Sequence, residues 1–259
     1  MAQLSITALG TVLGVWAHPD DEAYLSAGLM ALARDAGQRV VCVTATRGEH
    51  GTADPTTWPP GRLGSLREVE ARASLSALGV TEHHLLGYVD GTCGAQDAAA
   101  AIDRLVDIIA DVRPDTIVTF GPDGITGHDD HRTVSAWATA AHRRAAADTR
   151  LLYATTTAAF ADRWQDLHDR FNIYLDPDLP LRTPAEDVAL EIQFDGALAD
   201  RKLVALRAQA SQTAGLVATI GEQRYRAWIA TEAFTLAPTS GGALQTAVEH
   251  RASGTPVTL

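Results

Sequence analysis

The sequence predicts an α/β fold in which a mostly parallel, doubly wound sheet carries helices on both faces and is followed by a small C-terminal α+β extension. Two observations predict this class. Short β-branched runs alternate with longer helical patterns through the first 157 residues, as in successive βαβ units. Glycine and proline punctuate the junctions between them. We expect a single domain over residues 1–259, with its core at 11–157 and the extension at about 171–238.

The core is expected to hold five strands and four helices in alternation. Gly37 and Gly79 follow the first two helices as C-caps, and Pro114 stops the third just before a strand. Short right-handed crossovers then predict that ligands bind outside the carboxyl ends of the strands. The expected strands are 11–16, 39–44, 84–86, 116–120 and 151–156, and the expected helices are roughly 23–36, 63–78, 98–112 and 132–146.

Two segments interrupt the alternation. Residues 48–64 are rich in glycine and proline and predict a long loop after the second strand, with Trp58 in it; such loops often serve as lids or binding loops. Residues 171–184 carry three prolines and link the core to the extension. There we expect a strand at 188–194, a helix at 197–211 and a strand at 233–236.

Composition narrows the possible partners to small molecules. The net charge is -11, and no basic patch is evident, which disfavours nucleic acid and anionic lipid surfaces. No run approaches the roughly 20 apolar residues that a membrane-spanning helix needs. Two cysteines cannot build a disulfide framework in a chain of this size, so a cytoplasmic location is expected. Nothing in the sequence indicates the oligomeric state.

One histidine and three carboxylates crowd the turn where the first strand meets the first helix. These residues are His18, Asp20, Asp21 and Glu22. A purely structural role would require a partner for each charge, although a helix N-terminus partly favours negative charge. The motif therefore indicates a functional site.

Two further histidines follow the fourth expected strand. His128 and His131 are joined by an acidic turn. Because parallel strands deliver their C-terminal loops to one crevice, the two motifs are expected to meet. Imidazole and carboxylate oxygen suit zinc, and a hydrolytic zinc site uses three protein ligands and leaves one position for water. Two histidines and one aspartate would meet that count.

The two motifs resemble those of the PIG-L (LmbE-like) family of zinc-dependent de-N-acetylases. The resemblance rests on Ala17-His18-Pro19-Asp20-Asp21-Glu22 and on His128-Asp129-Asp130-His131, and it extends from about Thr11 to Pro238. It implies a Rossmann-like fold and an enzyme that hydrolyses C–N bonds other than peptide bonds. Further matching segments are Thr46-Arg47-Gly48-Glu49, Leu66-Arg67-Glu68-Val69-Glu70, Gly87-Tyr88-Val89-Asp90-Gly91, and the late Lys202, Leu206 and Gln212.

The resemblance also implies a role for each reacting group. His18, Asp21 and His131 would bind one Zn²⁺ per chain, and Fe²⁺ could occupy the same set of ligands. Asp20 would be the general base that takes a proton from metal-bound water as it attacks the amide carbonyl. His128 would help the metal to stabilise the oxyanion.

Five more residues are implied to surround this centre. Arg67 and Asp90 would contact the substrate, since both can form directional hydrogen bonds to sugar hydroxyls. Arg67 could instead form a surface pair with Glu70. Arg47 and Glu49 would order the loop after the second strand, and Glu22 would support a metal ligand.

The chain departs from the family pattern at three positions. Asp129 stands where many members have proline, which adds a negative charge. Thr126 stands where some have tyrosine, and Gln209 where relatives often have histidine, so tyrosine assistance and substrate contacts near Gln209 are not implied. Cys93 follows Asp90 closely, but nothing supplies the base that would activate it as a nucleophile.

The sequence thus predicts a zinc-dependent hydrolase that removes an N-acetyl or similar short N-acyl group from a small polar substrate, such as an N-acetylglucosamine conjugate. An alternative is that the same zinc site cleaves another C–N bond, in a thiol-conjugate amide or a cyclic imide. A non-catalytic metal-binding or sugar-binding protein is a further alternative, although such a module does not need a base like Asp20 beside the metal.

Overall fold

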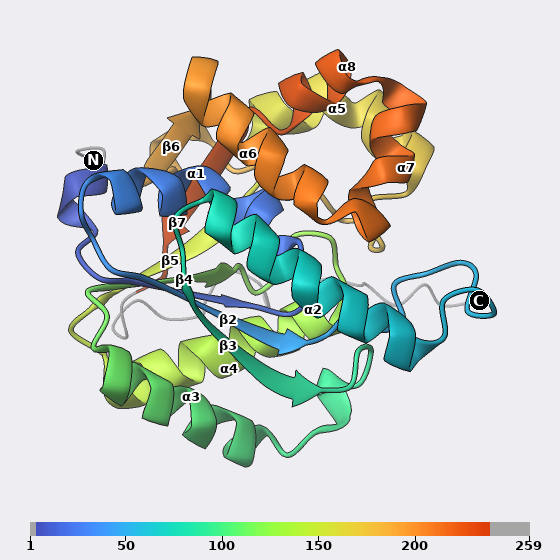
Figure 1. Ribbon diagram of the computed structural model, residues 1–259. Coiled ribbons are helices and arrows are strands. Elements are labelled where there is room, and N and C mark those ends of the chain that lie inside the picture. The colour runs from blue at the N-terminus through green and yellow to red at the C-terminus, as the bar shows by residue number, and fades with distance from the viewer. Residues whose placement is uncertain (1–3, 239–259) are drawn as a thin grey trace, which may run out of the picture.

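A seven-stranded mixed sheet forms the centre of the protein in a computed structural model that describes residues 4–238 (Figure 1). Its strands are β1 (Val12–Trp16), β2 (Val40–Thr46), β3 (Glu82–Tyr88), β4 (Thr116–Phe120), β5 (Arg150–Thr155), β6 (Leu190–Gln193) and β7 (Thr231–Leu236). They lie in the order β3-β2-β1-β4-β5-β7-β6. The first five are parallel to one another, whereas β7 is antiparallel to both β5 and β6. The predicted α/β class is confirmed.

The three central strands explain where the site can form. Every residue of β1, β2 and β4 is buried, as expected for parallel strands covered on both faces. Val12 of β1 pairs with Val40 of β2 and with Thr116 of β4, so the three strands run in register. The segments that leave their carboxyl ends therefore start side by side at one edge of the sheet.

Helices cover both faces, as predicted. Figure 1 shows α1 (Asp21–Asp35) and α2 (Pro60–Ala77) on one face and α3 (Ala98–Val112) and α4 (Asp129–Ala145) on the other. In the extension, α6 (Gly196–Ala208) packs against α1 and α2. None of the helices within residues 4–238 has the combination of length and apolar character needed to cross a bilayer.

The structure differs from the sequence prediction in four places. Three helices were not expected, namely α5 (Ala158–Phe171), α7 (Ala210–Ile220) and α8 (Glu222–Trp228). The helix expected at 197–211 ends instead at Ala208, and α7 starts after a break at Gln209. The loop expected at 48–64 is shorter, because Pro60 takes the first position of α2, where its missing N–H costs nothing. The strand expected at 84–86 extends over 82–88.

A buried ion pair joins the extension to α1. Lys202 Nζ of α6 lies 2.8 Å from Glu232 Oε1 of β7 and donates to the Tyr24 carbonyl at 2.7 Å. Glu232 also accepts from the backbone N–H groups of Gly28 and Leu29, at 2.9 and 3.1 Å. All polar atoms of this pair thus have partners, as a buried ion pair requires. The pair fixes β7 and α6 against the helix that begins with Asp21.

Candidate metal centre

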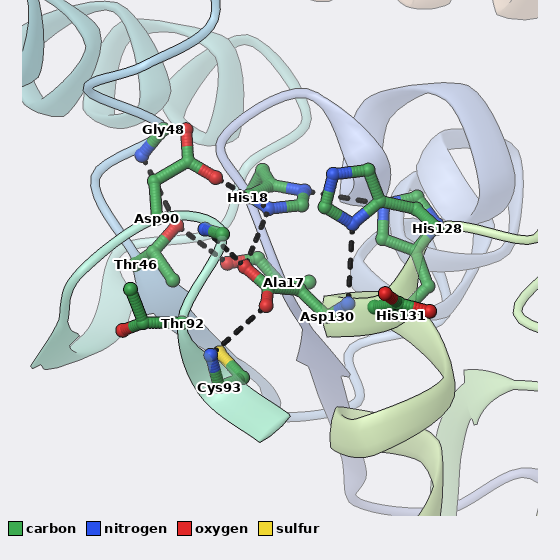
Figure 2. Close-up of polar contacts among 12 residues, drawn as sticks. Ala17, His18, Thr46, Gly48, Asp90, Thr92, Cys93, His128, Asp130 and His131 are labelled. Atoms are coloured by element: carbon green, nitrogen blue, oxygen red, sulfur yellow. Dashed lines mark hydrogen bonds and ion pairs between the residues drawn. The ribbon is translucent and has the colours of Figure 1, made fainter. Parts of the chain in front are cut away.

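The two sequence motifs meet at the carboxyl edge of the sheet. His18 follows β1, Asp21 opens α1, and His131 lies in the first turn of α4, which follows β4. Figure 2 shows the rings of His18, His128 and His131 gathered together. His18 and His131 retain less than a tenth of their exposed surface, as does Asp21. The three predicted metal ligands are therefore neighbours in a largely water-excluded place.

The donor atoms of these three residues have spacings that suit a metal ion. His18 Nδ1 lies 3.1 Å from His131 Nε2. The two oxygens of Asp21 face different rings: Oδ2 is 3.5 Å from His18 Nδ1 and Oδ1 is 3.3 Å from His131 Nε2. Ligands about 2.05 Å from a tetrahedral zinc are about 3.3 Å apart, so the two ring nitrogens have a suitable spacing, and one oxygen of Asp21 lies beside each of them.

The outer nitrogens of the two rings fix their tautomers. His131 Nδ1 lies 3.0 Å from the Gly124 carbonyl, which can only accept, so Nδ1 carries the proton. His18 Nε2 lies 3.0 Å from Asp90 Oδ1 and 3.2 Å from Asp130 Oδ2, so Nε2 carries the proton there. In the neutral rings two lone pairs then face each other at 3.1 Å. A cation between them would remove this repulsion.

Electrostatics act differently on the three groups. Burial lowers the pKa of His131 to about 4, so this ring is neutral near pH 7. Burial opposes protonation of His18 too, but the carboxylates of Asp130, Asp21 and Asp90 outweigh it and raise the pKa of His18 above its usual value. Burial would raise the pKa of Asp21, yet His131 and His18 lower it to about 2. The site therefore attracts positive charge, whether a proton or a metal ion.

Asp130 orients His18, a role that was not predicted for it. Its Oδ2 lies 3.2 Å from His18 Nε2 and accepts from the Gly91 backbone at 2.7 Å, and its Oδ1 accepts from the Cys93 backbone at 2.9 Å (Figure 2). A carboxylate behind a metal-ligating histidine holds the ring and makes it a better ligand. The signal was in the sequence, since Asp130 directly precedes His131.

Asp20 lies beside the three ligands, in a strained backbone conformation. Its φ is 104°, a region that residues with a side chain rarely adopt. Its backbone N–H donates to Glu22 Oε2 at 3.0 Å, and Arg67 Nη2 lies 3.2 Å from its Oδ2. Burial raises the pKa of Asp20 to about 7, although the Arg67 guanidinium opposes this. Strain of this kind concentrates at functional sites.

His128 is the N-cap of α4. Its Nδ1 accepts from the Asp130 backbone at 3.1 Å, so the neutral ring carries its proton on Nε2. Within residues 4–238, the groups of three side chains that bring donor atoms within 4.8 Å of one another are His18 with His128 and His131, and His18 with Asp90 and Asp130. Because Nδ1 of His128 is occupied and Nε2 is protonated, its ring suits hydrogen-bond donation better than metal ligation.

The two predicted substrate contacts are already engaged within the protein. Arg67 is 3% exposed, and it donates to the Pro19 carbonyl and, at 2.7 Å, to the Gly48 carbonyl. Its expected alternative as a surface partner of Glu70 is wrong, because both side chains are buried and Glu70 accepts from Ser211 instead. Asp90 accepts from the His50 backbone at 3.0 Å and lies against His18.

The residues predicted to support the site have separate partners. Glu49 Oε1 accepts from the backbone N–H of Asp90 at 3.3 Å, and Arg47 pairs with Glu68 on the surface. Glu22 is buried beneath Asp20, and its Oε1 accepts from Gln209 at 2.6 Å. Burial, reinforced by Asp20, raises the pKa of Glu22 to about 8.

The departures from the family pattern have different places in the structure. Asp129 is exposed at the first position of α4, so its added charge points to solvent. Thr126 Oγ1 lies 3.3 Å from His131 Nδ1. Burial raises the pKa of the Cys93 thiol, which agrees with an unreactive cysteine. Trp58 lies in the loop before α2, where the Arg62 guanidinium stacks 4.5 Å from the centre of its ring.

A cavity of about 330 Å³ opens beside the metal centre. Asp20, Asp21 and His131 line it. Its other walls come from the end of β5, from α5 and α8, and from β7. A substrate held there would reach the predicted ligands and the predicted base together.

Comparison with known proteins agrees with this geometry. The profile of the PIG-L family, described as GlcNAc-PI de-N-acetylase, matches residues 13–142, a range that includes both motifs. The chain belongs to the PIG-L family. A relative from Saccharomonospora viridis, a 1D-myo-inositol 2-acetamido-2-deoxy-alpha-D-glucopyranoside deacetylase, is 31% identical over 228 residues, covering 78% of this chain and 84% of the relative. The predicted family and enzyme class, a hydrolytic N-deacetylase, are confirmed.

Solved structures share the fold of this PIG-L chain. The N,N'-diacetylchitobiose deacetylase of Pyrococcus horikoshii is similar with a TM-score of 0.61 at 20% identity, covering 93% of this chain and 89% of its own. GalB, the 4-carboxy-2-hydroxymuconate hydratase of Pseudomonas putida KT2440, is similar with a TM-score of 0.60 at 16% identity, covering 91% and 100%. A deacetylase and a hydratase thus share one fold, so the reaction must be argued from the site.

Proposed function

We propose that this PIG-L protein is a zinc-dependent hydrolase that removes an N-acetyl or similar short N-acyl group from a conjugate of N-acetylglucosamine. One observation carries the proposal: His18 Nδ1 and His131 Nε2 face each other at 3.1 Å beside the Asp21 carboxylate. Asp20 lies next to this set and lines the same cavity. A donor set with an adjoining carboxylate is what metal-dependent amide hydrolysis needs.

The donor set favours zinc. Two imidazole nitrogens and one carboxylate leave a fourth tetrahedral position open, and zinc in such a site polarises a carbonyl and activates water. Asp130 and the Gly124 carbonyl would hold the two rings in the tautomers that ligation requires.

The residues around the donor set divide the proton transfers between them. Asp20 would accept the proton of the attacking water, because its carboxylate is oriented by Arg67 and its pKa of about 7 suits a base at neutral pH. His128 Nε2–H would donate to the developing oxyanion, since its Nδ1 is occupied by the Asp130 backbone. Protonated Asp20 would then deliver its proton to the leaving amine.

The proposed substrate rests on the relatives and on Arg67 and Asp90. The relative from Saccharomonospora viridis is named as a deacetylase of an inositol conjugate of N-acetylglucosamine, and the Pyrococcus horikoshii protein as a deacetylase of diacetylchitobiose. Arg67 and Asp90 lie on the side of His18 that faces β2 and β3, where hydroxyl groups of a sugar could exchange hydrogen bonds with them.

Amine release from a substrate panel tests the proposal. Purified protein is stripped of metal, reloaded with Zn²⁺ or Fe²⁺, and given N-acetylglucosamine, N,N'-diacetylchitobiose and the inositol conjugate. We expect release from at least one member with the metal-loaded protein and none with the stripped protein. Release that is equally fast without metal would contradict the metal-dependent mechanism, and no release from any member would contradict the proposed substrate class.

A further inference from the structure

The cavity beside the metal centre is lined mainly by hydrocarbon and aromatic surface. Beyond the carboxylates at its metal end, its walls include Tyr24, Phe160, Leu216, Trp228 and Ile229. The first of these comes from α1, the second from α5, and the others from α7, α8 and the turn after α8. An N-acetyl group brings a single methyl to such a surface. Liquid water occupies roughly 30 Å³ per molecule, so a methyl would leave most of the 330 Å³ unfilled.

Several polar atoms in the walls already have partners within the protein, although His168 Nδ1 has none in residues 4–238. Trp228 Nε1 donates to His168 Nε2 at 3.2 Å. Thr155 Oγ1 and Thr183 Oγ1 share a hydrogen bond at 2.6 Å. The Glu232 carboxylate accepts hydrogen bonds from the Lys202 ammonium and from two backbone N–H groups of α1. What these walls offer a ligand is therefore chiefly apolar area, which favours hydrocarbon over hydroxyl groups.

The opposite side of the metal centre is polar. Arg67 and Asp90 approach His18 and Asp20 from α2 and from the end of β3. In the sheet order, β3 and β2 lie on one side of β1, whereas β5 and β7 lie beyond β4 on the other. An amide held at the metal centre would thus have one end towards polar groups and the other towards the apolar cavity.

Resting on the proposed function, we propose that the cavity binds the acyl chain of the substrate and selects N-acyl groups longer than acetyl. The hydroxyl-rich amine half matches the side of Arg67 and Asp90, and a hydrocarbon chain matches the apolar walls between α5, α8 and β7. Each methylene buried against those walls adds up to about fourfold in affinity. Burying a sugar ring there instead would leave its hydroxyl groups without partners.

A chain-length series tests the proposal. The zinc-loaded protein is given N-acetyl-, N-butyryl-, N-hexanoyl- and N-octanoylglucosamine, and kcat/KM is measured for amine release. We expect kcat/KM to rise at least tenfold from acetyl to hexanoyl. A flat or falling series overturns the proposal. A second series keeps the N-acetyl group and lengthens an alkyl aglycone on the sugar. If kcat/KM rises with the length of that aglycone, the proposal is also overturned, because the cavity would then hold the other half of the substrate.

Two variants of α7 separate the cavity from general effects. Leu216→Trp fills the cavity from its wall, whereas Ala218→Trp places the same ring on the exposed side of the same helix. We expect Leu216→Trp to lower kcat/KM for hexanoyl much more than for acetyl and so to remove the preference, and Ala218→Trp to retain the preference. Equal loss for both acyl groups in Leu216→Trp, with unchanged circular dichroism, overturns the proposal.

Binding of free carboxylates tests the cavity without relying on turnover. Calorimetry with acetate and octanoate compares two ligands that share the same carboxylate, so the difference between them reports the hydrocarbon chain alone. We expect octanoate to bind at least tenfold more tightly than acetate, with a negative heat-capacity change, and Leu216→Trp to abolish the difference. Equal affinities overturn the acyl-chain cavity even if deacetylation is found. Loss of all amine release, with octanoate still preferred, contradicts the proposed function alone.

Discussion

The carboxylate of Asp130 lies directly behind the ring of His18, with Oδ2 at 3.2 Å from Nε2. Asp130 is itself held by the backbone N–H groups of Gly91 and Cys93, so its position does not depend on His18. Because α4 carries both Asp130 and His131, one helix start supplies a proposed ligand from the second motif and orients a proposed ligand from the first. This relationship places Asp130 in the proposed metal centre.

Replacing Asp130 should weaken metal binding. In Asp130→Asn one end of the side chain becomes an N–H donor, which would face either a backbone N–H or His18 Nε2. We expect zinc affinity to fall roughly tenfold to a hundredfold, measured by competition with a chromogenic chelator. Asp129→Asn is the matched control, since it removes the same charge from an exposed neighbour and should leave the affinity unchanged. Equal effects in both variants would mean that charge alone, rather than contact with His18, acts on the metal.

Replacing Asp20 should remove turnover while the metal stays bound. Asp20→Asn keeps the shape of the side chain but cannot accept a proton, so kcat should fall roughly a hundredfold to ten-thousandfold. Near-normal kcat with one zinc per chain would show that another group is the base.

Replacing Gly28 should weaken the packing of the extension onto α1. The Cβ of an alanine at position 28 would overlap the Phe194 ring, so Gly28→Ala forces the backbone or the ring to move. We expect a loss of about 1–3 kcal/mol in the free energy of unfolding, measured with urea. Gly61→Ala is the control, since nothing lies within 4 Å of its Cβ and alanine favours helices. A loss of the same size in Gly61→Ala would contradict the packing argument.

Breaking the buried ion pair Lys202–Glu232 should lower the free energy of unfolding far more than breaking an exposed ion pair. Lys202→Met leaves the Glu232 carboxylate buried without its counter-ion, which should cost about 3–5 kcal/mol in the free energy of unfolding. Arg144→Met breaks the exposed pair with Asp103 and should cost no more than about 1 kcal/mol. If the two variants lost similar amounts of unfolding free energy, burial would not determine how much an ion pair contributes to stability.

The parallel core was predictable because its signals are local. Runs such as Val40–Thr46 are buried on both faces and therefore read as continuous hydrophobic segments, with glycine or proline at their ends. The two motifs could be placed together because a parallel sheet brings the carboxyl ends of its strands to one edge. Tertiary contacts were not needed for either step.

The extension was harder to predict, for physical reasons that differ between elements. α5 had local signals that were overlooked: Thr157 caps its start with a hydrogen bond to Phe160 N, and Asn172 ends it in a left-handed conformation. The break at Gln209 had none, because it is coupled to a hydrogen bond with Glu22, 187 residues away in the chain. The cavity likewise depends on β7 adding antiparallel to β5, which no local pattern encodes.

The central claim is that His18, Asp21 and His131 hold the metal ion on which deacetylation depends. The most direct test measures zinc content and amine release together in His131→Ala and in His142→Ala, a histidine near the other end of the same helix. We predict one zinc per chain and full activity for the wild type and for His142→Ala, and loss of both in His131→Ala. Zinc and turnover retained in His131→Ala would contradict the account.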